Sequence, residues 1–126
     1  MVLDTKRATE KTILIVEDDA ATGELLCLFL SEETPHRAIL VPDGFQALNV
    51  IKDITPDLFL LDYRLPRMNG KELYNHLHTT KGLEHIPTIM TSTNALEQET
   101  EDSNVTVCIK PFDLDELLTM VEKLLA

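Results

Sequence analysis

The sequence has no tryptophan, few cysteines and no long run of apolar residues. Its two cysteines, Cys27 and Cys108, are far apart and form neither a Cys-x-x-Cys motif nor a Cys/His metal spacing. Each stands in an apolar run, so we expect both to be core side chains rather than redox groups. The longest apolar run, residues 25–30, falls far short of the roughly 20 residues of a membrane helix. Residues 1–11 also lack the apolar segment of a signal peptide, so we expect a cytoplasmic protein.

Positive charge is also scarce. The chain has 11 Lys and Arg against 22 Asp and Glu, which gives a formal net charge of −11. Such a chain repels the phosphates of nucleic acids and anionic lipids, so neither a nucleic acid nor a membrane is an expected partner. The four histidines show no metal-binding spacing and receive no metal role. A divalent cation or a basic protein surface suits this charge better.

The length of 126 residues suits a single domain. We predict a polar N-terminal extension over residues 1–11 and one folded domain over residues 12–126. Within that domain, apolar runs alternate five times with segments of helical periodicity. The runs are rich in branched residues and nearly continuous, as in parallel strands covered on both faces. They predict strands over residues 13–16, 38–41, 58–61, 86–90 and 105–109.

A helix is predicted after each strand. The first covers about residues 20–32, with Leu25, Leu26 and Phe29 on one face, and the last begins after Asp113, a residue suited to an N-cap. The fourth is expected to be short or irregular, because residues 95–104 hold only one large apolar side chain. Five such units predict an α/β fold, a parallel sheet with helices on both faces.

Acidic residues stand where two of the predicted strands end. Asp18 and Asp19 follow the first strand, and Asp62 follows the third. Ligands of parallel sheets bind at the carboxyl ends of the strands, so we expect these carboxylates to meet. Two carboxylates about 4 Å apart repel by about 4 kcal/mol at an effective dielectric of about 20, which favours a cation between them. Few ligands, all of them oxygen, suit Mg²⁺, whereas the simpler alternative is that Asp18 or Asp19 caps the following helix.

Two further polar residues end predicted strands. Ser92 closes the fourth and Lys110 closes the fifth, where a lysine commonly just extends its ammonium into water. Together with Asp62 and a metal, however, they form a set suited to phosphoryl transfer to an aspartate. The metal and the ammonium would neutralise phosphoryl oxygens, the hydroxyl would donate a hydrogen bond, and the carboxylate would attack phosphorus.

Four segments in this order resemble the receiver domains of two-component response regulators, including the chemotaxis receivers. They are ILIVEDD (residues 13–19), DYRLPRMNG (62–70), IPTIMTS (86–92) and KPF (110–112). The resemblance covers about residues 11–126 and implies a flavodoxin-like doubly wound sheet of five parallel strands, in the order 2-1-3-4-5, with five helices. It implies a phosphoacceptor signalling domain, which catalyses only its own phosphorylation and dephosphorylation. The phosphate would come from a sensor histidine kinase or phosphotransfer protein. The signal would pass to a downstream protein, or through a homodimer.

The resemblance also implies a role for each acid of the site. Asp62 matches the phosphoacceptor, Asp19 the direct Mg²⁺ ligand, and Asp18 the acid that reaches the metal through water. Arg64 matches the position whose backbone carbonyl completes the metal shell. Glu17 is left out of the predicted site, because its position varies in the family.

On the opposite side of the site, Ser92 matches the hydroxyl that follows the phosphoryl group on activation. Lys110 matches the lysine that pairs with the phosphoryl oxygens, and its bond to Pro111 matches a cis peptide bond of the family. Two departures stand out. Val107 replaces the usual Tyr or Phe, and the stretch from Ser92 to Lys110 is about one helical turn short. They leave open a second interpretation, an adaptor that keeps the fold and works without phosphorylation.

Two enzyme classes fit the sequence less well. Phosphatases with an aspartyl nucleophile usually carry a second Asp two residues later, where this chain has Arg64. A flavin-binding protein of this fold needs a phosphate-binding loop after the first strand, where three acids would repel phosphate.

Overall fold

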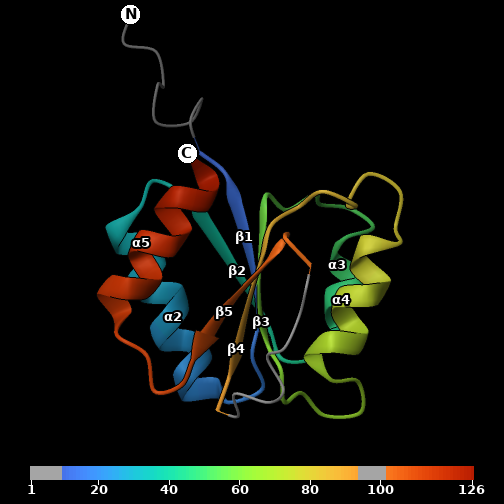
Figure 1. The fold of residues 1–126 in the computed structure, drawn as a ribbon, viewed down its shortest axis with the longest axis horizontal. Helices are drawn as coiled ribbons and strands as arrows, with labels where there is room; N and C mark the ends of the chain where they lie inside the picture. The colour runs from blue at the N-terminus through green and yellow to red at the C-terminus, as the bar shows by residue number, and fades with distance from the viewer. Residues whose placement is uncertain (1–9, 94–101) are drawn as a thin grey trace, which may run out of the picture.

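The computed structural model describes residues 10–93 and 102–126, which contain five strands and four helices. The strands are β1 (Thr12–Val16), β2 (Arg37–Val41), β3 (Leu58–Asp62), β4 (Thr88–Ser92) and β5 (Val105–Ile109). The helices are α2 (Ala20–Glu33), α3 (Gly44–Val50), α4 (Gly70–His78) and α5 (Leu114–Leu125). Figure 1 shows the sheet as a central layer, with α2 and α5 on one face and α3 and α4 on the other. No helix within the described ranges is both long and apolar enough to cross a bilayer.

All strand pairs are parallel, and the strand order is β2-β1-β3-β4-β5. This confirms the predicted doubly wound sheet. The predicted fourth of five helices falls mainly on residues 94–101, which lie outside the described residues. Strand β4 begins at Thr88 rather than at the predicted residue 86, because Pro87 has no N–H for the ladder and stands just before it.

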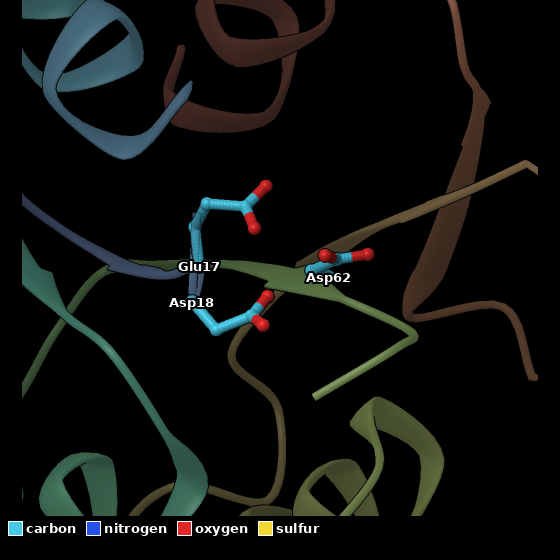
Figure 2. Close-up of side chains that lie close together, drawn as sticks. All are labelled: Glu17, Asp18 and Asp62. Carbon is cyan, nitrogen blue, oxygen red and sulfur yellow. The ribbon is translucent and has the colours of Figure 1, made fainter. Parts of the chain in front are cut away.

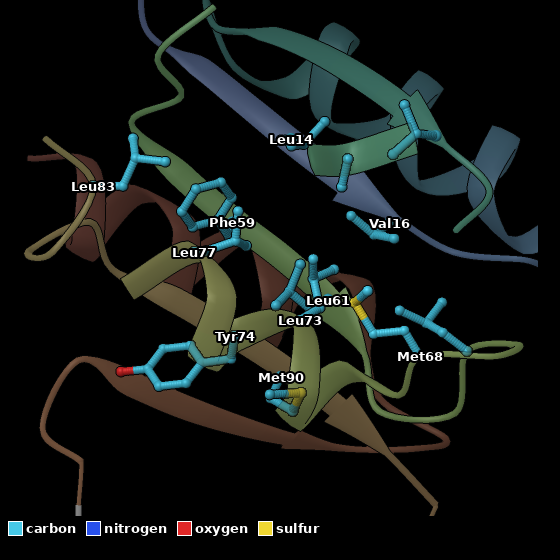
Figure 3. Packing of buried hydrophobic residues seen from close by; sticks show 13 residues of the cluster. Leu14, Val16, Phe59, Leu61, Met68, Leu73, Tyr74, Leu77, Leu83 and Met90 are labelled. Carbon is cyan, nitrogen blue, oxygen red and sulfur yellow. The ribbon is translucent and has the colours of Figure 1, made fainter. Parts of the chain in front are cut away.

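The strands bury side chains on both faces, which is why their sequences are continuously apolar. Residues of one parity, such as Leu14 of β1 and Phe59 and Leu61 of β3, pack against α4 and the neighbouring α3 (Figure 3). Residues of the other parity, such as Ile15 and Leu60, pack against α2 and α5. Two cores on a rigid sheet hold the ends of β1, β3, β4 and β5 in fixed positions relative to one another.

Helix α2 differs from the prediction in the face that it buries. Leu26 and Leu30 face the sheet, whereas Leu25 and Leu28 are 54% and 57% exposed. Leu25, expected on the same face as Leu26, is therefore on the exposed side while Leu26 is buried. The helix is apolar on nearly every side, so its periodicity does not distinguish an inner face from an outer one.

The two cysteines lie in the core facing α2 and α5, as predicted. Cys108 is buried and Cys27 is half-buried, and both thiols are free. The Cys27 thiol donates to the carbonyl of Ala38, with 3.7 Å between sulfur and oxygen. Burial raises the pKa of the Cys108 thiol, which disfavours its reactive thiolate form.

Candidate functional site

Three carboxylates converge at the carboxyl edge of the sheet. Glu17 and Asp18 follow β1, and Asp62 is the last residue of the neighbouring strand β3. One carboxylate oxygen of each lies within 4.8 Å of the others, as Figure 2 shows from close by. Glu17 and Asp62 are buried, whereas Asp18 is exposed at the entrance. The predicted meeting of acids from the first and third strands is therefore confirmed.

The acids at the end of β1 that lie in the cluster are Glu17 and Asp18, one position earlier in the chain than the predicted pair, Asp18 and Asp19. Asp19 is the N-cap of α2, and its carboxylate accepts hydrogen bonds from the hydroxyl and the backbone N–H of Thr22. These two hydrogen bonds lower the pKa of Asp19. The structure thus places Asp19 outside the acid cluster, at the start of α2, and Glu17, left out of the predicted site, lies in the cluster with Asp18 and Asp62.

This difference arises from the position at which β1 ends. Val16 is the last strand residue, so the next two residues stand at the sheet edge, and the third already begins the helix. Counting from the end of the strand would have selected Glu17 and Asp18. The N-cap preference of Asp was weighed from the sequence, but the sequence did not say which of the two aspartates would use it.

Lys110 provides the positive charge of the site. Its Nζ lies 3.1 Å from Oε1 of Glu17 and 3.4 Å from Oδ2 of Asp62. Burial alone would lower the pKa of Lys110, but the carboxylates of Asp62 and Glu17 outweigh burial and raise it. The ammonium is therefore firmly charged and shared between two acids. The Lys110–Pro111 peptide bond is cis, as predicted.

Ser92 and Arg64 complete the set of predicted site residues. Ser92 is the last residue of β4, is 1% exposed, and accepts a hydrogen bond from the Lys110 N–H at 2.8 Å through its carbonyl. Arg64 is exposed, and its backbone N–H donates to Oδ1 of Asp62 at 3.3 Å. Both residues therefore lie beside the acid cluster, at the ends of the two central strands.

The donor set fits a small divalent cation. Three carboxylates face one ammonium, so the cluster retains an excess of two negative charges when all four groups are ionised. The ligands are all oxygen and few in number, which suits Mg²⁺, an ion that keeps several of its waters. The carboxylate of Asp18 is exposed, so water can reach the cluster from its side.

The loop between β3 and α4 is closed by short hydrogen bonds next to Asp62. The Gly70 N–H donates to the carbonyl of Tyr63 at 2.7 Å, and the Met68 N–H donates to the carbonyl of Pro66 at 2.7 Å. A Cβ on Gly70 would lie 2.5 Å from the carbonyl oxygen of Asp62, so only glycine fits there. Arg67 has a φ of 66°, a left-handed conformation that costs an L-residue about 1–2 kcal/mol.

The comparisons with known proteins agree with this geometry. The sequence profile of the response regulator receiver domain matches residues 13–122. The chain belongs to this family. Receiver domains in general accept phosphate from histidine kinases, act as signalling domains rather than classical enzymes, and bind Mg²⁺ in an acidic site.

Relatives of this receiver include longer regulators. It is 35% identical over 120 residues to the DNA-binding response regulator MtrA of Mycobacterium tuberculosis (strain ATCC 25618 / H37Rv), covering 94% of this chain and 51% of MtrA. It is 29% identical over 116 residues to the phosphate regulon transcriptional regulatory protein PhoB of Escherichia coli K12, covering 89% of this chain and 50% of PhoB. The chain thus spans about half the length of these relatives, to which the names assign DNA binding or transcriptional regulation.

A solved structure supports the metal chemistry of the fold. The receiver domain of the sensor histidine kinase PA1611 from Pseudomonas aeruginosa PAO1 was solved with magnesium in its active-site cleft. It matches with a TM-score of 0.82 and 26% identity, over 92% of this chain and 98% of that one.

Proposed function

We propose that this receiver takes a phosphoryl group onto Asp62 from a phosphohistidine of a sensor kinase or phosphotransfer protein, in a Mg²⁺-dependent reaction. It would then signal by contact with a downstream protein. The observation that carries the proposal is the position of the Asp62 carboxylate. It ends a central strand, shares a small volume with Glu17 and Asp18, and has the Lys110 ammonium at 3.4 Å.

The chemistry follows from these contacts. One carboxylate oxygen of Asp62 forms a bond to phosphorus, while the bond from phosphorus to the donor imidazole breaks and its electron pair stays on nitrogen. Lys110, already paired with Asp62, moves onto a phosphoryl oxygen, and the Ser92 hydroxyl donates to another. Bound Mg²⁺ would supply further positive charge to the phosphoryl oxygens.

The contacts of each acid suggest how the metal would be held. Glu17 is committed to Lys110 and to the backbone N–H of Asp19, at 3.1 and 3.2 Å. Asp18 is the exposed member of the cluster and faces the entrance. We therefore assign direct contact with Mg²⁺ to Asp18, Asp62 and the carbonyl of Arg64, and contact through water to Glu17.

A test is to incubate the chain with acetyl phosphate and Mg²⁺ and to measure its intact mass. The parent should gain one phosphate, and Asp62→Ala should gain none. Asp53→Ala, which removes an exposed acid in the turn after α3, is the matched control and should react as the parent does. An adduct that persists in Asp62→Ala would contradict the assignment. No adduct on the folded parent would favour the phosphorylation-independent adaptor.

The docking site of the phosphodonor must border Asp62, because a histidine on the donor has to reach that carboxylate. An apolar groove adjoins Lys110 at this edge, between α2 and the start of α5, and its apolar lining includes Leu25 and Phe112. Together with the exposed Leu28, it forms an apolar surface on the outer face of α2 that is exposed to water. We place the donor protein on this groove.

This placement predicts that a substitution in the groove changes phosphorylation by a kinase but not by a small phosphodonor. Leu25→Glu should be phosphorylated at the parent rate by acetyl phosphate, which needs no docking surface. It should react much more slowly with a sensor kinase that phosphorylates the parent. Equal rates with the kinase would move the docking surface elsewhere.

A further inference from the structure

Arg67 lies in the left-handed region although it is not glycine, and among the described residues it is the only non-glycine residue to do so. Its side chain is 68% exposed, so burial of that side chain does not account for the conformation. The hydrogen bond from the Met68 N–H to the Pro66 carbonyl spans Arg67, and Met68 is buried, so the backbone of the turn and its apolar neighbour contribute to it. Strained backbone of this kind persists where surrounding contacts determine it. The contacts of the Arg67 side chain indicate what else holds the loop in this shape.

Those contacts join Arg67 to the beginning of α3. Nη2 of Arg67 lies 3.4 Å from Oδ2 of Asp43, and the guanidinium carbon lies 4.9 Å from the centre of the Phe45 ring. Asp43 is the N-cap of α3, and its other carboxylate oxygen accepts from the Gln46 N–H at 2.8 Å. We call Arg67, Asp43 and Phe45 the Arg67 cluster. It ties the loop between β3 and α4 to the beginning of α3.

Close packing beside this cluster brings the same two segments together. A Cβ on Gly44 would lie 2.9 Å from the sulfur of Met68, so the loop residue after Arg67 already touches the first residue of α3. Exposed ion pairs and cation–π contacts of this kind add little net stability. They are of the same order as the backbone strain, so the main effect of the Arg67 cluster is to select one conformation of the loop.

That loop is the one that begins at Asp62 and includes Arg64. It is short and closed by the hydrogen bond from Gly70 to Tyr63, so a change at residue 67 is passed along it. We propose that Arg67 is a positioning residue for the metal site. By tying the loop to α3, it holds the Arg64 carbonyl where Mg²⁺ needs an oxygen ligand. This inference rests on the proposed metal site and extends it to residues that do not touch the ion.

The test compares Mg²⁺ binding by calorimetry with thermal unfolding of the metal-free protein, on the full chain. Arg67→Gly removes the contacts but adopts the left-handed conformation freely. We expect it to weaken Mg²⁺ binding by about tenfold, as loss of a residue that orients a ligand does, while its metal-free melting temperature equals or exceeds that of the parent. Lys52→Gly, which removes an exposed cation elsewhere, should bind Mg²⁺ as the parent does.

Two further variants test the mechanism. Arg67→Lys keeps the charge and should recover part of the affinity. Asp43→Asn keeps the helix cap, because Asn caps as well as Asp, but it loses the ion pair. It should weaken Mg²⁺ binding alone and cause no further loss when combined with Arg67→Gly, since both changes break the same contact.

Failure of this inference differs from failure of the proposed metal site. If the parent binds Mg²⁺, Asp18→Asn does not, and both Arg67→Gly and Asp43→Asn bind with the affinity of the parent, then Arg67 does not position the site. If Asp18→Asn binds Mg²⁺ as tightly as the parent, the metal site itself is misplaced and both proposals fall.

Discussion

Three consecutive acids at the end of β1 have three different surroundings. Glu17 is buried against Lys110, Asp18 is exposed within the acid cluster, and Asp19 caps α2. The differences arise because the chain leaves β1 and enters α2 within these three residues, so each acid has different neighbours. Substitution of each acid should therefore have its own effect on stability and on metal binding.

Asp18→Asn and Asp19→Ala should shift the stability of the metal-free protein in opposite directions. Asp18→Asn removes a repelling charge at an exposed position and should stabilise the fold by roughly 1 kcal/mol. Asp19→Ala removes the N-cap of α2 and should destabilise it by about 1 kcal/mol. Urea unfolding without Mg²⁺ measures both effects.

Adding Mg²⁺ provides the control for this pair. It should stabilise the parent and Asp19→Ala alike, by about 2.7 kcal/mol when free Mg²⁺ is 100 times the dissociation constant, and should leave Asp18→Asn unchanged. If Asp19→Ala lost the stabilisation by Mg²⁺ instead, Asp19 would be the ligand after all.

The sequence allowed most of the site to be predicted, because strand ends place residues reliably. Asp62, Lys110 and Ser92 all stand where their strands end. Asp19 was expected among the clustered acids but is the N-cap of α2, since choosing between adjacent acids requires the last strand residue to be known without error. The Arg67 cluster was beyond prediction, because it depends on a backbone angle and on a contact between residues 24 positions apart.

At the scale of elements, the first residues of two helices are both glycines packed against the β3–α4 loop. Gly70 begins α4 against the backbone of Asp62, and Gly44 begins α3 against the side chain of Met68. A backbone neighbour cannot move aside, whereas the end of a methionine side chain can. The two positions should therefore tolerate a methyl group very differently.

Gly70→Ala should destabilise the protein by about 1–3 kcal/mol, as overpacking in a close-packed interior does. Alanine favours helix by up to about 1 kcal/mol, but the close approach to the Asp62 carbonyl outweighs this gain. Gly44→Ala is the matched control and should change stability by less than about 1 kcal/mol. Thermal unfolding of the two variants, read side by side, measures the difference. Equal effects would show that the backbone after β3 moves away from an added methyl group as easily as the Met68 side chain does.

Elements with one clear face were easier to predict than α2. Strand β5 begins and ends where its apolar run does, and α5 has its N-cap at Asp113 as expected. In α2 the apolar residues surround the axis, so the sequence determined the helix but not its orientation. The orientation depends on which leucines fill the space beside β1 and β2, and that is a property of the packed fold.

At the scale of the whole molecule, the carboxyl and amino ends of the strands carry different side chains. The carboxyl edge holds the acids and Lys110, whereas the opposite edge holds connections joined by hydrogen bonds. There, the Lys11 N–H donates to Nδ1 of His36 at 3.1 Å, and the Thr12 N–H donates to the Asp57 carboxylate at 2.8 Å. These bonds join the segments that enter β1, β2 and β3.

His36 should make stability depend on pH at that edge. Burial, together with the charge of Lys11, lowers the pKa of His36, so the native state resists a proton that the unfolded chain accepts. Stability is therefore complete above the unfolded pKa of about 6.5 and is lost as pH falls through it toward the lower native value. Between pH 7 and 5, the melting temperature of the parent should fall further than that of His36→Gln. Parallel curves would mean that His36 titrates alike in both states.

The loop from α4 to β4 passes through Gly82, which has a φ of 92° and open space where a Cβ would project. It lies at the end of the sheet away from Asp62, apart from the acid cluster and from the groove between α2 and the start of α5. Short insertions are best tolerated at exposed loop tips of this kind. A fluorescent reporter or an affinity handle inserted at Gly82 would therefore leave the acid cluster around Asp62 intact, and partners of the protein could be captured with that site unaltered.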